Sequence, residues 1–211
     1  MDPSPVRDQY PHVDSTDLPF RVIFVCTGNI CRSPIAEQVF RSIYPSQSVQ
    51  FSSAGVHALA GHPMPGQAAA ISTRLGGKPD QHAGRQLTPR ILADADLVVA
   101  LSRGHRSEIV RTLPRANRYT FTLRELARLL ESLTREFQPS MVDASLSVAD
   151  RLRSVVPLIA GERGRATPPE SPEEDDVIDP YRRSQSIYDQ TEDEIVDSVS
   201  RIYQSVRAMM H

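Results

Sequence analysis

The chain has 211 residues, which is enough for one well-cored domain and short for two. Its 24 basic and 26 acidic residues give a formal net charge of −2, so the composition offers no electrostatic case for binding nucleic acid or an anionic membrane. No apolar stretch approaches the roughly 18 residues that span a bilayer, and two cysteines cannot build a disulfide framework, so a reducing, cytoplasmic location is expected.

The first part of the chain predicts a tail and then a buried strand. Residues 1–19 hold four prolines and four aspartates and no hydrophobic segment, and we expect a disordered tail there. A single domain is expected over residues 20–211. Residues 21–25 form a short apolar run typical of a central strand in a parallel sheet. Pro34 stands at the start of a predicted helix with one apolar face.

Strand and helix patterns alternate further along the chain. The further strands are predicted over 49–53, 95–101 and 119–121. The further helices are predicted over 68–75, from Pro89 after the Thr88 cap, over 104–112 and 123–133, and from a capping box at Thr191. This alternation predicts an α/β fold: a single domain whose open four-stranded parallel sheet is flanked by helices on both faces.

Residues 134–175 fit this alternation poorly. A helix over 142–159 is predicted despite Pro157, and a polar, proline-rich stretch then leads into an acidic run at 170–179. We expect 134–175 to be an insertion that ends in a mobile acidic loop.

The loop after the first strand carries the strongest chemical signal. Residues 26–33 read Cys-Thr-Gly-Asn-Ile-Cys-Arg-Ser and lie where a buried strand turns into a helix. Backbone N–H groups and a helix N-terminus bind a tetrahedral oxyanion there, and the Arg32 fork matches two of its oxygens. The same field favours a thiolate at Cys26. Attack by Cys26 on a phosphate ester or a similar oxyanion is predicted; a buried structural cysteine in a tight turn is the alternative.

The other loop residues have supporting roles in this interpretation. Gly28 permits close backbone approach, and Asn29 tolerates a left-handed conformation while its amide ties the loop together. Ser33 is placed to donate a hydrogen bond to the Cys26 sulfur. The loop amides that are expected to face the anion include those of Thr27, Ile30 and Cys31.

Other anion and metal sites are disfavoured by the same loop. A nucleotide-binding loop would end in Gly-Lys-Ser/Thr, whereas this one ends Cys31-Arg32-Ser33, and the glycine pattern of dinucleotide folds is absent. Two cysteines with no histidine nearby are a poor metal set. We therefore expect no metal and no cofactor.

Cys26 to Pro34 resembles the signature loop of the low-molecular-weight protein tyrosine phosphatase family. The resemblance covers residues 20–131 and 177–208 and indicates a bacterial-type member with an insertion. The further matching segments are Ser53-Ala54-Gly55, residues 82–88, residues 95–100 and Asp179-Pro180-Tyr181.

The resemblance implies a protein-tyrosine phosphatase that acts through a phosphocysteine intermediate. Cys26 would attack the phosphorus while the loop amides and Arg32 hold its oxygens. Asp179 would protonate the leaving phenolate and then activate water. Without the resemblance, Asp179 reads as part of a solvated acidic loop.

The resemblance also suggests the walls of the cleft. Tyr181 is expected to stack on a phenyl ring, and His57 is expected at a variable wall position, although a surface role is equally open for that histidine. Where family members often carry a second aromatic, this chain has Arg182 and Arg183, which indicates either a preference for acidic phosphopeptides or exposed surface. The histidines that lack a partner at a useful spacing, and that we interpret as structural, are His62, His82 and His105.

Two further expectations concern the loop and its support. The family suggests that Cys31 forms a reversible, protective disulfide with Cys26, besides packing under the loop. Leu101-Ser102 replaces the Met-Asp pair common in the family, which predicts looser support for the loop.

Two rival functions remain open from the sequence. An arsenate reductase coupled to an external small thiol would use the same oxyanion cradle, residues 26–33. The Asp179-Pro180 pair argues against this function, because arsenate reduction needs no leaving-group acid. A non-catalytic phosphotyrosine-binding module is the second rival. The expected partner is a phosphotyrosine protein substrate, such as a tyrosine kinase; no nucleic acid and no membrane span are expected, and the oligomeric state is not indicated.

Overall fold

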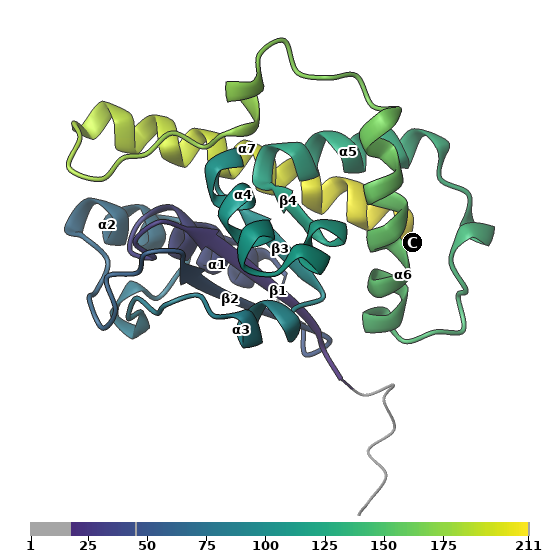
Figure 1. Ribbon diagram of the computed structural model, residues 1–211, viewed down its shortest axis with the longest axis horizontal. Helices are drawn as coiled ribbons and strands as arrows, with labels where there is room; N and C mark the ends of the chain where they lie inside the picture. Colours follow the sequence, from purple (N-terminus) through teal and green to yellow (C-terminus); the bar gives the residue numbers. More distant parts are fainter. Residues whose placement is uncertain (1–17, 45, 211) are drawn as a thin grey trace, which may run out of the picture.

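A four-stranded parallel sheet organises the chain (Figure 1). The computed structural model describes residues 18–44 and 46–210. The sheet has the order β2-β1-β3-β4, with every neighbouring pair parallel. Its strands are β1 Phe20–Cys26, β2 Val49–Gly55, β3 Leu97–Ala100 and β4 Thr120–Thr122. The predicted fold class, a single α/β domain with an open four-stranded parallel sheet, is confirmed.

Helices cover both faces of the sheet, as the alternation of strands and helices predicts (Figure 1). The α-helices are α1 Arg32–Ile43, α2 Gly66–Arg74, α3 Pro89–Ala93, α4 Arg103–Thr112, α5 Leu123–Glu136, α6 Val148–Gly161 and α7 Gln185–Met210. Short 3-10 turns occur at Pro79–Gln81, Pro114–Arg118, Pro139–Met141, Glu162–Gly164 and Pro172–Asp175. None of the helices in the described ranges is long and apolar enough to cross a membrane.

Strand β1 lies at the centre of the sheet and is apolar on both faces. Phe24 pairs with Ser53 of β2 on one side and with Val99 of β3 on the other. Val22 and Phe24 face a core built by α1, α5, α6 and α7, whereas Ile23 and Val25 face a smaller core built by α3 and α4. Because all strands run parallel, their carboxyl ends meet at one edge, where ligands bind in such folds.

The insertion predicted over 134–175 contains α6, which packs against α5 and β1. Pro157 lies within this helix. Arg153 of α6 donates to the carbonyl oxygens of Leu18 and Pro19, both at 2.9 Å. These two residues are thus held against the domain; the rest of the predicted tail lies outside the described residues.

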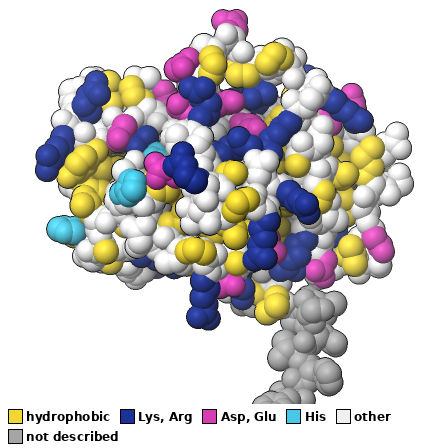
Figure 2. Space-filling view, in the orientation of Figure 1, with side chains coloured by type: hydrophobic (Ala, Val, Ile, Leu, Met, Phe, Trp, Pro, Cys, Tyr) yellow, Lys and Arg dark blue, Asp and Glu magenta, His cyan; other side chains and the backbone are white. Residues whose placement is uncertain are grey.

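The acidic run after α6 is held by arginines of α4 and α5. Arg128 donates to both carboxylate oxygens of Asp175, at 3.0 and 3.1 Å. Arg103 contacts Glu173 at 3.0 Å, and its backbone N–H donates to Asp176 at 2.6 Å. The negative charge of this segment is therefore offset locally. On the face shown in Figure 2, basic and acidic side chains are interspersed in the same way. The mobility expected of this loop stays a prediction.

The last helix begins earlier than the sequence predicts. Thr191 was the expected cap, but α7 starts at Gln185 and Thr191 lies fully buried inside it. The Thr191 hydroxyl contacts the carbonyl oxygens of Ile187, at 2.8 Å, and Ile178, at 3.3 Å. The predicted capping box is wrong because this hydroxyl bonds carbonyl groups instead of capping backbone N–H groups.

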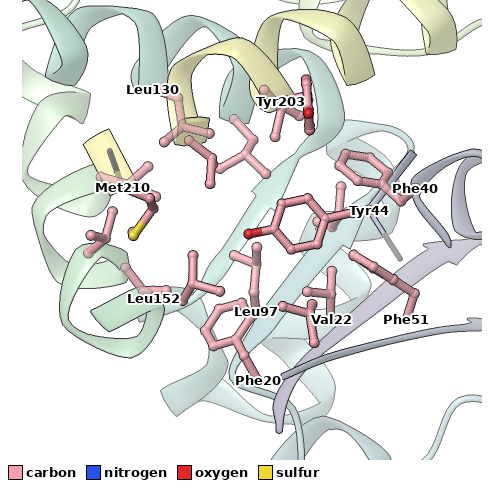
Figure 3. A pocket seen from close by; sticks show the side chains of 18 of the residues that line it. Phe20, Val22, Phe40, Tyr44, Phe51, Leu97, Leu130, Leu152, Tyr203 and Met210 are labelled. Carbon is pink, nitrogen blue, oxygen red and sulfur yellow. The ribbon is translucent and has the colours of Figure 1, made fainter. Parts of the chain in front are cut away.

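An apolar cavity of about 80 Å³ lies between the sheet and helices α1, α5, α6 and α7 (Figure 3). Phe20 and Val49, the first residues of β1 and β2, line it, so it lies toward the end of the sheet away from Cys26. Val22 and Leu97 line it from the strands, and Leu152 lines it from α6. The Tyr44 ring points into it, and burial raises the pKa of that phenol. Helix α6 of the predicted insertion thus packs into the main core without filling it completely.

Candidate active site

Cys26 ends β1, and Arg32 begins α1, so the predicted loop closes the carboxyl edge of the central strand. Strand β2 ends beside it at Gly55, where any side chain would collide with the Thr27 carbonyl. Glycine is therefore required for the close approach of these two backbones. The loop thus stands at the edge where parallel sheets bind their ligands.

The Cys26 sulfur sits at the floor of the loop with two hydrogen-bonding neighbours. Ser33 Oγ lies 3.0 Å from Sγ, and the backbone N–H of Asn29 donates to Sγ at 3.3 Å. Cys26 is only 3% exposed. Donors of this kind, together with a helix N-terminus, stabilise negative charge on sulfur.

Asn29 braces the loop from within. Its φ of +55° is left-handed, and its side chain is fully buried. The amide nitrogen donates to Ser33 Oγ at 2.9 Å and to Ser53 Oγ at 2.8 Å. Its amide oxygen accepts the backbone N–H of Arg85 at 2.9 Å, and its carbonyl accepts His82 Nε2–H at 2.6 Å. The loop is thereby tied to β2 and to the segment at 82–85.

A second brace runs from α4 to Thr27. The Ser102 hydroxyl caps α4 by accepting the backbone N–H of His105, and it lies 2.8 Å from His105 Nδ1. His105 Nε2 lies 2.9 Å from Thr27 Oγ1. Burial, aided by the charge of Arg32, lowers the pKa of His105 to about 3, so its ring is neutral. Since Ser102 oxygen already accepts an N–H, we assign its hydrogen to Nδ1, which leaves Nε2–H to donate to Thr27.

Arg32 and Asp179 form an ion pair across the mouth of the loop. Arg32 Nη2 lies 2.9 Å from Asp179 Oδ2, and Nη1 donates to the Val177 carbonyl at 3.2 Å. The Arg32 side chain is 7% exposed, whereas that of Asp179 is 54% exposed. Backbone hydrogen bonds hold the approach to Asp179, because Val177 N–H donates to the carbonyl of Leu101 at 3.0 Å. The acidic side chain thus reaches the loop from a distant segment.

Cys31 lies beneath the loop as a free, buried thiol. Its Sγ is 3.9 Å from the hydroxyl of Tyr188 in α7. Burial raises the pKa of Cys31 to about 12, so this sulfur is protonated. The Cys26 sulfur, in contrast, has hydrogen-bonding neighbours in Ser33 and in the backbone N–H of Asn29. The two cysteines therefore occupy electrostatically different places in one loop.

A cleft of about 260 Å³ opens above Cys26. Six of the residues predicted for substrate binding line it, together with the proposed catalytic Arg32: Thr27, Gly28, Ile30, Cys31, His57 and Tyr181. Asn29 and Ser33 are buried under the loop, where they bond the sulfur and each other. His57 is on the wall but largely exposed, and it contacts Glu108 at 3.3 Å.

The sequence does not point to Leu59 and leaves the role of Arg182 open; both residues line the cleft. His82 and His105 hold the loop. The two histidines are structural, as interpreted, but they act on the loop itself. Ser102 supports the loop through His105, whereas the looser support expected at this position stays a prediction. Across the residues that the structure describes, no group of three His, Cys, Asp or Glu side chains forms a metal site.

Comparison with known proteins supports one family. The family model described as "Low molecular weight phosphotyrosine protein phosphatase" matches residues 21–138. The low molecular weight protein-tyrosine-phosphatase Etp of Escherichia coli (strain K12) is 40% identical over 93 residues, which cover 44% of this chain and 62% of that protein. The match thus spans less than two thirds of that relative's length. The protein-arginine-phosphatase of Geobacillus stearothermophilus is 35% identical over 108 residues, 51% of this chain and 72% of that protein.

Solved structures agree with this assignment. The low molecular weight protein tyrosine phosphatase from T. tengcongensis superposes with a TM-score of 0.61 at 25% identity, covering 88% of this chain and 98% of that chain. A YwlE mutant from Bacillus subtilis superposes with a TM-score of 0.62 at 26% identity, covering 89% and 99%.

Proposed function

Because this chain belongs to the low molecular weight phosphotyrosine protein phosphatase family, we propose that it hydrolyses phosphotyrosine in proteins through a phosphocysteine on Cys26. The single observation that carries the proposal is the convergence of three groups at one cleft. A buried thiol, a guanidinium and a carboxyl group meet there from β1, α1 and the segment before α7.

The first step forms the phosphocysteine. The Cys26 thiolate attacks phosphorus and forms the S–P bond, while the bond from phosphorus to the tyrosine oxygen breaks. The loop amides and the Arg32 fork hold the remaining oxygens as charge develops on them. Asp179, in its protonated form, gives its proton to the departing phenolate. Its place at the cleft mouth suits a group that must meet the leaving oxygen.

The second step returns the enzyme to its starting state. Asp179, now ionised, takes a proton from a water molecule that attacks the phosphorus. The S–P bond breaks, inorganic phosphate forms, and the electron pair returns to the Cys26 sulfur. Ser33, 3.0 Å from that sulfur, donates a hydrogen bond that stabilises the departing thiolate.

The Arg32–Asp179 ion pair describes the free state of this site. A phosphate dianion competes with Asp179 for the Arg32 fork, because both are anions that match it. Substrate binding therefore separates Asp179 from Arg32 and leaves this carboxyl group free to meet the leaving oxygen of the first step.

The walls of the cleft support an aryl substrate. Ile30, Leu59 and Tyr181 offer apolar contacts to a phenyl ring. A phosphoarginine side chain would need an acidic neighbour for its guanidine. Within residues 18–44 and 46–210, Asp179 is the one carboxylate that lines the cleft, and the proposed mechanism uses it as the acid. These walls favour phosphotyrosine over phosphoarginine, the substrate class named for the Geobacillus relative.

The test compares wild type, Cys26→Ser and Asp179→Asn on peptides bearing phosphotyrosine, phosphoserine or phosphoarginine. We expect turnover of phosphotyrosine only, no turnover by Cys26→Ser, and a roughly 10²- to 10⁴-fold lower kcat for Asp179→Asn. Thiol-dependent arsenate turnover without aryl phosphate hydrolysis would instead identify the arsenate reductase. Tight phosphopeptide binding with no hydrolysis would identify the binding module.

The cellular setting belongs to the same proposal. A thiolate nucleophile persists in a reducing compartment, which supports a cytoplasmic location. A phosphotyrosine protein, such as an autophosphorylated tyrosine kinase, is the expected partner.

A further inference from the structure

We propose that Arg182 reads an acidic residue next to the phosphotyrosine, so that the preferred substrates carry Asp or Glu beside the phosphorylated position. This inference rests on the proposed function and concerns the rim of the same cleft. Arg182 lines that cleft together with Cys26 and Tyr181, whereas Arg183 does not. The sequence leaves two interpretations open for these arginines, a preference for acidic phosphopeptides or exposed surface. Arg182 suits the first interpretation and Arg183 the second.

The backbone at Arg182 provides the first argument. Its φ is +59°, and it shares this left-handed conformation with only one other non-glycine residue of the described ranges, Asn29. Arg182 is the third residue of a turn closed by a hydrogen bond of 2.9 Å from Arg183 N–H to the Pro180 carbonyl. Glycine serves such a position without steric cost, and a long side chain does not. An arginine at this point indicates that its side chain is used.

The placement of the guanidinium provides the second argument. It lies over the ring of Tyr181, 5.1 Å from the ring centroid, so the two side chains form one wall of the cleft. A cation–π contact of this kind holds the guanidinium beside the ring and does not occupy its N–H donors. The wall therefore offers an apolar surface to the substrate ring and a cation beside it.

The surrounding charges provide the third argument. Among the residues that the structure describes, Arg182 forms no ion pair with a carboxylate, while Arg32 at the floor of the cleft is paired with Asp179. His57 also lines the cleft, and its carboxylate neighbour Glu108 does not. An arriving carboxylate beside the phosphotyrosine thus finds one unpaired guanidinium at the rim, with geometry suited to a two-point contact.

The experiment measures kcat/KM for phosphotyrosine peptides that differ only at the two flanking residues. One series carries Asp before the phosphotyrosine, one after it, and the reference carries Ala on both sides. The variants are Arg182→Gln, which keeps the backbone strain and removes the charge, and Arg182→Lys, which keeps the charge. Arg183→Gln is the matched control, because it removes a neighbouring exposed charge that does not line the cleft.

We expect the wild-type ratio of acidic to neutral peptide to be about two- to fivefold, which is the scale of an exposed ion pair. We expect this ratio to fall to near one in Arg182→Gln and to stay above one in Arg182→Lys. In Arg183→Gln the ratio should equal that of the wild type. Raising the salt to ~0.5 M reduces the wild-type ratio, because the contact is exposed.

Three results overturn the inference: a wild-type ratio near one, a ratio that survives in Arg182→Gln, or an equal loss by Arg182→Gln on all peptides. The last result would show that Arg182 serves only the cleft wall. Turnover of the neutral peptide separates this inference from the function on which it rests. If no peptide is hydrolysed, the proposed function fails; if all are hydrolysed without regard to flanking charge, only the role of Arg182 fails.

Discussion

Arg32 Nη2 and Asp179 Oδ2 lie 2.9 Å apart in an ion pair, although the two residues are far apart in the sequence. One is the side chain proposed to hold the phosphate, and the other is the proposed acid. In the free site the charge of Arg32 is therefore paired with that of Asp179. A substrate anion must replace the Asp179 carboxylate in order to bind Arg32. This relationship makes binding and catalysis separable by a single substitution.

Asp179→Asn is expected to strengthen product binding while slowing turnover. Removal of the competing carboxylate charge frees the Arg32 fork, and we expect inorganic phosphate to inhibit at an about two- to fivefold lower concentration, a modest gain because Asp179 is half exposed. The inhibition constant for phosphate, measured with p-nitrophenyl phosphate, checks this. An unchanged or raised inhibition constant would contradict the proposed competition.

The neutral His105 ring is expected to make stability depend on pH. Its folded pKa of about 3 is below the ordinary value of 6.5, so the unfolded chain binds the extra proton between these values. Its contribution to stability is complete above pH 6.5 and is lost as the pH falls toward 3. Between pH 7.5 and 5 the loss is about 2 kcal/mol.

Urea unfolding of wild type and His105→Gln at both pH values measures this contribution. The variant, which keeps an amide donor for Thr27, should lose about 2 kcal/mol less than wild type on acidification, because glutamine does not titrate. Equal losses in the two proteins would show that the His105 ring is not the group responsible.

The apolar cavity predicts that a larger side chain at Val22 is stabilising. Val22→Ile adds one methylene toward the space of about 80 Å³, and we expect a gain of roughly 0.5–1 kcal/mol in the free energy of unfolding. Val98→Ile is the matched control, because Val98 is fully buried in the core on the opposite face. That change is expected to cost roughly 1–3 kcal/mol by overpacking. If both changes destabilise equally, the cavity cannot accept the added carbon.

Cys31 is expected to protect Cys26 from irreversible oxidation. Its thiol is protonated because burial raises its pKa to about 12, so peroxide reacts first with Cys26, and the resulting sulfenic acid condenses with Cys31. Treatment with peroxide followed by dithiothreitol should restore wild-type activity but not that of Cys31→Ser. Equal recovery of both proteins would exclude the disulfide.

Features that depend on residues close together in the sequence could be predicted, whereas features that depend on contacts between distant residues could not. The thiol and the arginine of the proposed site can be predicted from the sequence because Cys26, the loop and Arg32 are contiguous, and one strand and one helix set their positions. The role proposed for Asp179 could be predicted only from the family resemblance. An acidic run alone does not reveal that Arg128 and Arg103 bind Asp175 and Asp176, whereas Asp179 lies beside Arg32 at the cleft.

The roles of His105 and His82 could not be predicted, because each depends on a contact with a residue far away in the chain. The sequence left two interpretations open for Arg182, because its place depends on a backbone angle. The early start of α7 was missed for a similar reason: the Thr191 hydroxyl bonds the carbonyl of Ile178, which the fold brings beside it. Local patterns give the elements and the cradle, whereas the supports of the cradle arise from tertiary packing.

The most direct test of the central claim is mass spectrometry of Asp179→Asn quenched in acid during turnover of p-nitrophenyl phosphate. The p-nitrophenolate group of this substrate departs readily without an acid, so the first step still proceeds in the variant. Because the variant lacks the base for the second step, the phosphocysteine intermediate accumulates. The account predicts one phosphoryl group on the peptide that contains Cys26, absent in the Cys26→Ser/Asp179→Asn double variant. Turnover without any phosphoryl group on Cys26, or a phosphoryl group on another residue, would contradict it.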